Sequence, residues 1–288
     1  MTASLTEPAY AKLNLTLDVL GRRADGFHDL RMVMQSVSLH DDIVLTLTEE
    51  PGVRLTTNFS FLPTDGKNLA VMAARAFQQA TGVDVGGLRI RVDKHIPVCA
   101  GTAGGSSDAA AVLRGLNRLF ETGLTPEQLA KIGEGVGSDV PYCVLGGTAL
   151  AEGRGERLTR LPSLPDCAIV MCKPSFSVST PELFHRIDSF KLRCHPDTAG
   201  MLKALEGGSL QGVAHRLYNV FEDVLPPQQG NAIREIRQSL IESGALGACL
   251  SGTGPTVFGL FGTEEEARQA AAVLSPAYRD TYVVRPVS

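Results

Sequence analysis

Residues 97–111 read PVCAGTAGGSSDAAA, and this stretch decides how the rest of the chain is interpreted. It follows 88–93, where apolar and polar residues alternate as in a half-buried strand. It overlaps the start of 107–120, where apolar residues recur at helical spacing. Glycines between a strand and a helix let backbone N–H groups approach phosphate oxygens, and a helix N-terminus adds about half a positive charge. The stretch therefore predicts an anion-binding loop, although a glycine-rich turn that only begins a helix has the same composition.

This loop matches neither of two widespread nucleotide-binding patterns. The P-loop pattern ends in G-K-[ST], and residues 97–111 contain no lysine. The dinucleotide pattern G-x-G-x-x-G is also absent from it. Binding of phosphate would therefore depend on backbone N–H groups and on the hydroxyls of Ser106 and Ser107.

The composition is that of an ordinary globular enzyme. The 288 residues are 43% hydrophobic and 20% charged, with a net charge of −4. A mildly acidic protein has no overall attraction to nucleic acid or to an anionic membrane. No apolar stretch approaches the ~20 residues of a membrane span, and the N-terminal residues lack the pattern of a signal peptide. We expect a cytoplasmic protein with a small-molecule substrate, and neither a nucleic-acid nor a membrane partner.

The cysteines favour the same compartment, because none of them forms a C-x-x-C pair and a structural zinc site is therefore not indicated. We expect reduced thiols that act as small apolar side chains. They are Cys99, Cys143, Cys167, Cys172, Cys194 and Cys249.

Strand and helix signals are mixed along the rest of the chain, which predicts an α+β fold. The predicted strands are 43–48, 88–93, 168–172, 248–250, 256–261 and 282–284. Helices are predicted to start at Thr180-Pro181 and at the capping box formed by Thr263 and Glu266. A polar, proline-bearing stretch at 153–165 predicts a domain boundary, which we place between residues 155 and 156.

Two segments contain side chains suited to catalysis. In 9–15, AYAKLNL, strand periodicity puts Lys12 and Asn14 on one face, where they could meet a carboxylate and a substrate hydroxyl. In 137–141, GSDVP, Asp139 could be a buried general base. Each also has a simpler explanation: an exposed strand face for the first, and a helix cap or turn for the second.

Two more segments contain features of ligand binding. Phe27 and His28 follow a glycine turn, so that the ring could stack on a nucleobase and the imidazole could bond to it. A buried aromatic beside a surface histidine is the alternative. The glycine-rich segment 250–256, LSGTGPT, could approach a phosphate or merely join two strands.

Taken together and in this order, these segments resemble the galactokinase–homoserine kinase–mevalonate kinase–phosphomevalonate kinase (GHMP) superfamily. Its three motifs are an N-terminal lysine-bearing strand, a central glycine- and serine-rich loop, and a late glycine turn between two strands. Within it, longer segments are similar to the kinases that act on a cytidine-diphosphate-linked methylerythritol (CDP-methylerythritol). These segments are PAYAKLNLTLDVLGRRADGFHDL (8–30), DGKNLA (65–70), GGSSDAA (104–110), GSDVPYCVLGGTALAEGRGE (137–156), LYNVFE (217–222) and LSGTGPTVFGLF (250–261). The chain departs from the family pattern at Thr102, where leucine is usual, and at Phe27, where tyrosine is frequent.

The resemblance implies a ribosomal-protein-S5-like domain over 1–155 and a ferredoxin-like domain over 156–288, with substrate bound between them. It implies transfer of the γ-phosphoryl group of ATP, accompanied by Mg²⁺, to the 2-hydroxyl of CDP-methylerythritol in the non-mevalonate isoprenoid pathway. Phosphoryl transfer depends mainly on alignment and on neutralisation of charge. By resemblance, the ATP-binding positions are Asn68, Lys94, Pro97, Gly101, Gly104, Gly105, Ser106 and Ser107.

The same resemblance implies the catalytic roles. Asp139 would take or orient the proton of the acceptor hydroxyl. Lys12 would keep that carboxylate ionised and offset the developing charge. Ser107 is one candidate ligand for Mg²⁺. For the substrate, His28 would bond to the cytosine edge, Phe27 and Phe184 would stack on its faces, and Asn14 would help to place the acceptor.

Two other functions fit parts of the pattern. A sister kinase acting on homoserine or mevalonate would share the fold, but it would not need an aromatic–histidine base pocket. A nucleotide-sensing module without enzymatic activity would not need both Lys12 and Asp139.

Overall fold

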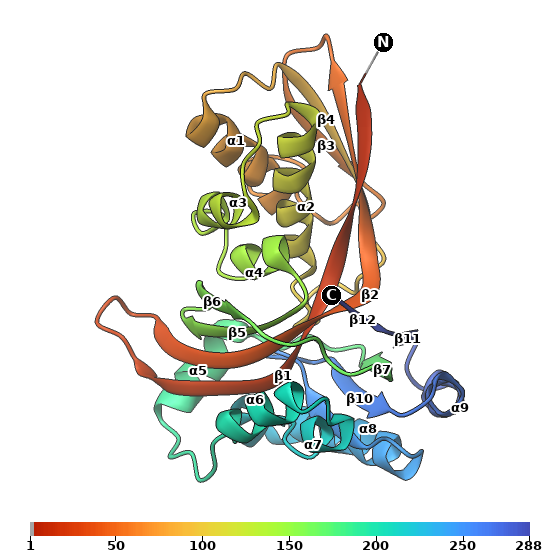
Figure 1. The fold of residues 1–288 in the computed structure, drawn as a ribbon. Helices are drawn as coiled ribbons and strands as arrows, with labels where there is room; N and C mark the ends of the chain where they lie inside the picture. Colours follow the sequence, from red (N-terminus) through yellow and green to blue (C-terminus); the bar gives the residue numbers. More distant parts are fainter. Residues whose placement is uncertain (1–2) are drawn as a thin grey trace. The chain divides into compact units, whose positions relative to one another are not determined.

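The computed structural model describes residues 3–288, and the chain divides into two compact units (Figure 1). Strands β1 (Ser4–Arg22) and β2 (His28–Thr48) run through both units, so each unit is assembled from segments far apart in sequence. The first unit contains the chain up to Ala11, Leu39–Ile96 and Ala103–Gly146. The second unit contains Lys12–Ser38, Pro97–Thr102 and Gly147–Ser288. The predicted boundary between residues 155 and 156 stays a prediction.

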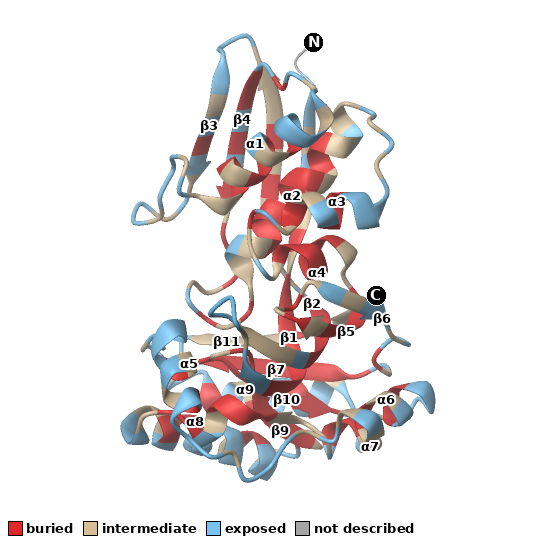
Figure 2. Cartoon of the chain, turned by 90° about the vertical axis from the view of Figure 1, so that its left-hand side faces the viewer, coloured by how far each residue is buried: buried red, intermediate tan, exposed pale blue. Residues whose placement is uncertain are grey.

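The first unit is a sheet with helices on one of its faces (Figure 1). Strand β4 pairs antiparallel with β2 and parallel with β3. Alternation puts Leu88, Ile90 and Val92 into the core and leaves Arg89 and Arg91 exposed, as the pattern predicts. Figure 2 shows that α2 is buried along most of its length. The elements of this unit after β2 are β3 (Gly52–Thr57), α1 (Leu69–Thr81), β4 (Gly87–Asp93), α2 (Gly104–Leu119), α3 (Pro126–Gly133) and α4 (Val140–Leu145).

Helix α2 begins at Gly104, three residues before the predicted start at Ser107. Ala103 precedes it with a left-handed backbone (φ 58°, ψ 28°) and no side-chain cap, and the N–H of Ser107 donates to the carbonyl of Ala103 (2.8 Å). The predicted start lies three residues too late because it followed the apolar spacing, which begins at Ala109 and has no counterpart in 104–107. Burial of the apolar face from Ala109 to Leu116 supports the whole helix, including this polar first turn. The glycines and serines 104–107 therefore form the first helical turn and not a loop.

The second unit contains an antiparallel sheet in the order β11-β7-β10-β9. Numbered along the chain as 1 to 4, these strands lie in the order 4-1-3-2, with helices in the connections β7–β9 and β10–β11, which is the ferredoxin-like topology. The predicted α+β class and the ferredoxin-like fold are confirmed. Helices α8 and α9 pack against this sheet. Separately, β5 pairs with β2 and β6, β12 pairs with β2, and β8 pairs with β1.

The second unit contains the helices and strands that follow α4 in the sequence. They are β5 (Thr148–Gly153), β6 (Arg157–Arg160), β7 (Ala168–Lys173), α5 (Thr180–Asp188), α6 (Thr198–Glu206), α7 (Leu210–Ala214), β8 (Tyr218–Asn219), a 3₁₀ helix (Val220–Asp223), α8 (Pro227–Glu242), β9 (Gly247–Leu250), β10 (Val257–Phe261), α9 (Glu264–Leu274), β11 (Asp280–Val284) and β12 (Pro286–Val287).

Most predicted elements are confirmed, with shifts of a residue or so at their ends. Strands β4, β7, β9, β10 and β11 lie where the alternation and the apolar runs predict them. The capping box of Thr263 and Glu266 begins α9. For α5 the cap is Ser179 and not Thr180, so proline occupies the second helical position. Among residues 3–288, the six cysteines form no disulfide, and no helix has the length and apolarity needed to cross a membrane.

Packing predicts opposite effects for two glycine-to-alanine changes, one in a helix of each unit. A Cβ at Gly115 in α2 would lie 2.5 Å from Cδ1 of Leu45 in the core. A Cβ at Gly230 in α8 would meet nothing nearer than 3.4 Å. We expect Gly115→Ala to lower the free energy of unfolding by about 1–2 kcal/mol, because overpacking exceeds the gain in helix propensity. Gly230→Ala should raise it by about 0.5–1 kcal/mol. Equal shifts in the thermal midpoints of both variants would contradict this account.

Candidate active site

The two glycines in the first turn of α2 differ in how closely they are packed. A Cβ at Gly104 would lie 3.1 Å from Nζ of Lys94 and 3.2 Å from Cγ2 of Ile96, so packing around Gly104 is tight. A Cβ at Gly105 would meet only Cδ1 of Leu69, at an ordinary 3.6 Å, and Gly105 is exposed. Packing therefore does not explain the glycine at 105, and its bare backbone leaves this turn open to a ligand.

Three segments of the first unit meet at this turn. Leu69, the first residue of α1, lies against Gly105. A Cβ at Gly137, two residues before Asp139, would lie 3.8 Å from Oγ of Ser106 and 3.9 Å from Cδ1 of Leu69. The structure thus brings the predicted segments 65–70, 104–110 and 137–141 together.

The two serines of this turn differ in what they can offer. Ser107 is buried, and its Oγ donates to the backbone carbonyl of Tyr10 (2.6 Å). Its hydroxyl thus fastens α2 to β1. Ser106 is half-buried and is the serine hydroxyl of this turn that a phosphate can reach.

Lys94 lies in a buried cluster with two aspartates beside Gly104. Its Nζ donates to Oδ2 of Asp108 (2.8 Å) and to Oδ2 of Asp41. Asp41 also accepts from the backbone N–H groups of His95 (2.5 Å) and Ile96 (2.8 Å). Oδ1 of Asp108 is buried and has no hydrogen-bond partner within residues 3–288. Asp41 is therefore well solvated by donors, whereas Asp108 is not.

This difference determines where the cluster takes up a proton. Burial raises the pKa of Asp108 to about 7, against the opposing effect of the Lys94 charge and with a contribution from Asp41. Burial alone would lower the pKa of Lys94, but Asp108 and Asp41 outweigh it and hold that pKa above its ordinary value. Near neutral pH the cluster contains a lysine cation and a carboxyl at Asp108 that gains a proton readily.

Two predicted ATP contacts are already engaged in structural bonds. The backbone N–H and carbonyl of Lys94 both bond to the side-chain amide of Asn58, at 2.9 and 3.1 Å. Asn68 is the N-cap of α1; its Oδ1 accepts from the N–H of Ala70 (2.9 Å) and its Nδ2 donates to the carbonyl of Pro63 (2.8 Å). Contacts from Lys94 and Asn68 to a nucleotide stay predictions.

In the second unit, the carbonyl of Gly101 is the point where the predicted segments meet. It accepts from Nζ of Lys12 (3.0 Å) and from Oγ of Ser251 (3.1 Å). Lys12 also donates to Oδ1 of Asn14 (2.7 Å), and the N–H of Asn14 donates to Oγ of Ser251 (3.3 Å). A Cβ at Gly101 would lie 2.3 Å from the carbonyl oxygen of Ser251. Only glycine permits this approach, and its φ of 75° also favours glycine.

Strand β1 is buried on both of its faces at this point. Lys12 (4% exposed) and Asn14 (0%) are as buried as Ala11, Leu13 and Leu15. The explanation of Lys12 as part of an exposed strand face is therefore wrong. Its buried ammonium is held by Asn14 and by the carbonyl of Gly101. Pro97 begins the segment 97–102 of this unit and is half-buried.

The predicted base-binding residues form a partly preassembled group. The rings of His28 and Phe184 stack with centroids 4.7 Å apart and an interplanar angle of 26°. Nε2 of His28 lies 2.6 Å from Oδ1 of Asp188. Phe27 is 51% exposed, with the guanidinium of Arg154 5.1 Å from its ring centroid. His28 is thus not a surface residue, and Phe27 is not a buried one.

Asp139 lies directly before α4, at the N-cap position. Its backbone is helical (φ −88°, ψ −11°), and its side chain makes no capping bond. The alternative explanation of a turn aspartate at a helix start therefore agrees with its position, although its side chain does not cap the helix. It is half-buried, so the predicted full burial is not observed either.

Sequence reasoning missed Asp41, Asp188 and the role of Ser251. Ser251 and Asp108 lie inside segments that were singled out, LSGTGPT and GGSSDAA, so their positions contained a signal. Asp41 and Asp188 had none, because each acts on a residue more than fifty positions away in the sequence.

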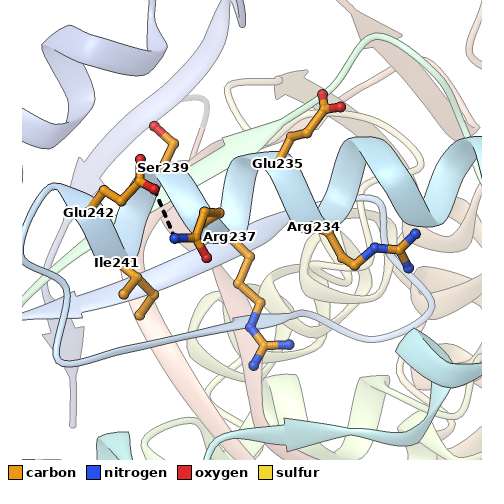
Figure 3. A pocket seen from close by; sticks show the side chains of 7 residues that line it. Arg234, Glu235, Arg237, Ser239, Ile241 and Glu242 are labelled. Atoms are coloured by element: carbon orange, nitrogen blue, oxygen red, sulfur yellow. Dashed lines mark hydrogen bonds between the residues drawn. The ribbon is translucent and has the colours of Figure 1, made fainter.

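Other features of the chain do not add to this site. Among residues 3–288, no group of three or more His, Cys, Asp or Glu side chains could hold a metal ion. A hollow of about 630 Å³ is lined by side chains from Arg234 to Glu242, all of them on α8. Figure 3 shows these side chains along the helix. The hollow contains none of the predicted site residues.

Two family models match the chain. One, described as the N-terminal domain of GHMP kinases, matches residues 68–147. The other, described as the C-terminal domain of GHMP kinases, matches residues 201–280. Together they include the first turn of α2, Asp139 and the 250–256 turn.

Relatives match nearly the whole chain. A 4-diphosphocytidyl-2-C-methyl-D-erythritol kinase of Lachnospira eligens is 46% identical over 262 residues, which are 91% of this chain and 90% of that protein. One of Alkaliphilus metalliredigens is 43% identical over 278 residues, 96% of this chain and 95% of that protein.

Solved structures agree with the sequence relatives. A crystal structure of 4-(cytidine 5'-diphospho)-2C-methyl-D-erythritol kinase matches with a TM-score of 0.82 and 31% identity, covering 99% of this chain and all of that one. A homoserine kinase from Cytophaga hutchinsonii matches with a TM-score of 0.76 and 18% identity, covering 99% of this chain and 94% of that one. At that identity, the second likeness shows the fold alone.

The buried cluster predicts a specific dependence of stability on pH. Because the pKa of Asp108 is raised in the folded state, the folded chain binds more protons than the unfolded chain between about pH 4 and 7. The free energy of unfolding due to this group therefore falls as pH rises through that window. Asp108→Asn should remove this fall, so the variant gains stability relative to the parent between about pH 5 and 8. Urea unfolding of the variant and the parent at about pH 5 and at about pH 8 measures this gain in the free energy of unfolding.

The matched control is Asp42→Asn. Asp42 follows Asp41 of the buried cluster in the sequence, but its own side chain is 42% exposed. We expect no comparable gain with pH for this variant. The same gain in both variants would show that the buried cluster is not its source.

Proposed function

Because the chain belongs to the GHMP kinases and, within them, to the family of 4-diphosphocytidyl-2-C-methyl-D-erythritol kinases, we propose that it transfers the γ-phosphoryl group of ATP to the 2-hydroxyl of 4-diphosphocytidyl-2-C-methyl-D-erythritol. The observation that carries the proposal is identity above 40% over at least nine-tenths of both chains. The reaction belongs to the non-mevalonate route to isoprenoid precursors. A cytoplasmic location and the absence of a nucleic-acid or membrane partner stay predictions from composition.

We propose that the phosphates of ATP bind at the first turn of α2. Gly105 leaves the backbone accessible there, and the N-terminus of a 16-residue helix favours an anion. Ser106 would add its hydroxyl. Gly101 and Pro97 would shape the segment that leads into this turn, and Lys94 would act by holding Asp108 beside Gly104.

Mg²⁺ would be brought with the nucleotide. This ion usually keeps several waters and binds substrate phosphates with one or two protein ligands, so a dedicated protein cage is not required. Ser107 fits poorly as one of these ligands, because its hydroxyl is buried and donates to Tyr10. We therefore assign no protein ligand to the ion.

We propose that Asp139 receives or orients the proton of the acceptor hydroxyl. Its side chain is not used as a helix cap, and it is half-buried, so its carboxylate is suited to this role. Lys12 would stabilise the charge that develops on the transferred group, since its ammonium is held in place by Asn14 and Gly101. Asn14 would orient the acceptor together with Lys12.

We propose that the cytosine is bound by Phe27, His28 and Phe184. If Nε2 of His28 donates to Asp188, Nδ1 is left as an acceptor, which suits the exocyclic amine of cytosine. The stack of His28 on Phe184 must open, or the base must lie beside it, for Phe184 to stack on the base. The exposed ring of Phe27 offers a second face.

A coupled ADP-release assay with three alcohols tests the proposal. We expect turnover with CDP-methylerythritol and none above background with homoserine or mevalonate. Turnover with one of the latter instead would favour a sister kinase. ATP binding without turnover of any of the three would favour a nucleotide-sensing module.

Replacing Asp139 tests its catalytic role. Asp139→Asn preserves shape and removes the base and its charge, so we expect kcat to fall by about 10²–10⁴-fold. The affinity for ATP, measured by calorimetry, should change little, because the phosphates are held by other residues. Near-normal turnover of the folded variant would exclude Asp139 from the mechanism.

The base pocket predicts a separation of the two Michaelis constants. Stacking is worth about 1–3 kcal/mol per base, so Phe27→Ala and Phe184→Ala should each raise the KM for CDP-methylerythritol by about 5- to 150-fold. The KM for ATP should stay nearly constant. Phe27→Tyr is the matched control and should be close to neutral, because the stacking face is kept. Unchanged KM values in both alanine variants would contradict the pocket.

A further inference from the structure

The segment LYNVFE at 217–222 contains a buried asparagine with no role in the account so far. Asn219 is 1% exposed and lies in β8, where it pairs with Leu17 of β1. Its Nδ2 donates to the carbonyl of Leu250 (2.8 Å) and to that of Gly252 (2.7 Å). Its Oδ1 accepts from the N–H of Phe221 (3.0 Å). Both N–H groups and the oxygen of the side-chain amide are thus engaged in hydrogen bonds. Two of these three bonds hold the end of β9 and the turn that follows it.

That turn is in contact with the ammonium of Lys12. A Cβ at Gly252 would lie 2.9 Å from the carbonyl oxygen of Gly101 and 3.3 Å from Nζ of Lys12. Ser251, between the two residues that Asn219 holds, donates to the same carbonyl of Gly101. A displacement of this turn would therefore move Gly101 and Lys12 with it.

We propose that Asn219 is a positioning residue for phosphoryl transfer: it fixes the 250–252 turn and, through that turn, the places of the Gly101 carbonyl and the Lys12 ammonium. The inference rests on the proposed role of Lys12. Asn219 touches neither of these two groups through a bond of its own. It acts only through the backbone that it holds.

The chemistry of the contact calls for an amide. Two carbonyl oxygens at 2.7 and 2.8 Å require two N–H donors, and a third bond requires an acceptor on the same side chain. Aspartate has the same shape but would put a carboxylate oxygen against two carbonyl oxygens. Serine retains a single donor.

The effect expected is on the chemical step. A misplacement of about 1 Å in a catalytic group can cost about 10²-fold in rate. We expect Asn219→Asp to lower kcat by about 10- to 100-fold and Asn219→Ser to lower it less, while the KM for CDP-methylerythritol changes by less than about twofold. An effect confined to kcat differs from loss of folded protein, which lowers the active fraction and the thermal midpoint together.

Glu222→Gln is the matched control in the same segment. The amide oxygen of glutamine can still accept from the N–H of Leu250, as Oε1 of Glu222 does (2.9 Å), while the ion pair with Arg237 (2.9 Å) is lost. This variant should lower the thermal midpoint and leave kcat per folded enzyme unchanged. An equal loss of kcat in Glu222→Gln would show that any change that destabilises this segment slows the reaction. That result would overturn the inference.

A double-mutant cycle with Lys12→Met decides whether Asn219 acts through Lys12. In single-turnover reactions, Asn219→Ser should slow the parent enzyme but add little to the slowing already caused by Lys12→Met. Additive effects, or a folded Asn219→Ser enzyme with the parent rate, would overturn the inference. Inactivity of the parent itself towards CDP-methylerythritol would instead overturn the proposed function.

Discussion

The carbonyl oxygen of Gly101 accepts two hydrogen bonds, one from the ammonium of Lys12 and one from the hydroxyl of Ser251. Through it, β1, the segment 97–102 and the turn after β9 are joined, although they are up to 239 positions apart in sequence (251 − 12 = 239). The constraint is steric as well as polar, since the backbones at Gly101 and Gly252 approach too closely for any Cβ. A lysine with 4% exposure is tolerated here because its charge meets polar acceptors.

The first unit also contains a buried lysine, Lys94, but its partners are carboxylates. There Lys94 is buried between two carboxylates, and its Nζ would lie only 3.1 Å from a Cβ at Gly104. In both units a buried lysine therefore lies against a glycine backbone. Around Lys94 two acceptors are ionisable carboxylates, whereas Lys12 donates to the amide oxygen of Asn14 and to the carbonyl of Gly101.

Local patterns predicted the elements well, because alternation and helical spacing are set by burial of one face. They predicted Lys12 and Asn14 as neighbours for the same reason, since every second residue of a strand shares a face. They placed the start of α2 three residues too late, because the apolar spacing does not extend into the polar first turn of this helix. They could not supply Asp188 for His28 or Asp41 for Lys94, because a pairing across more than fifty residues leaves no periodic trace. Phe27, His28 and Phe184 were predicted as a group, but the stacking of the His28 ring on the Phe184 ring was not.

The chain passes from one unit to the other after Ala11, Ser38, Ile96, Thr102 and Gly146. Two of these crossings lie within strands β1 and β2, and two flank the segment 97–102, which contains the proposed site residues Pro97 and Gly101. A single recombination breakpoint can therefore not exchange one unit and leave the other intact. Exchange of one unit by recombination would need several breakpoints at once, whereas substitutions within the chain need none.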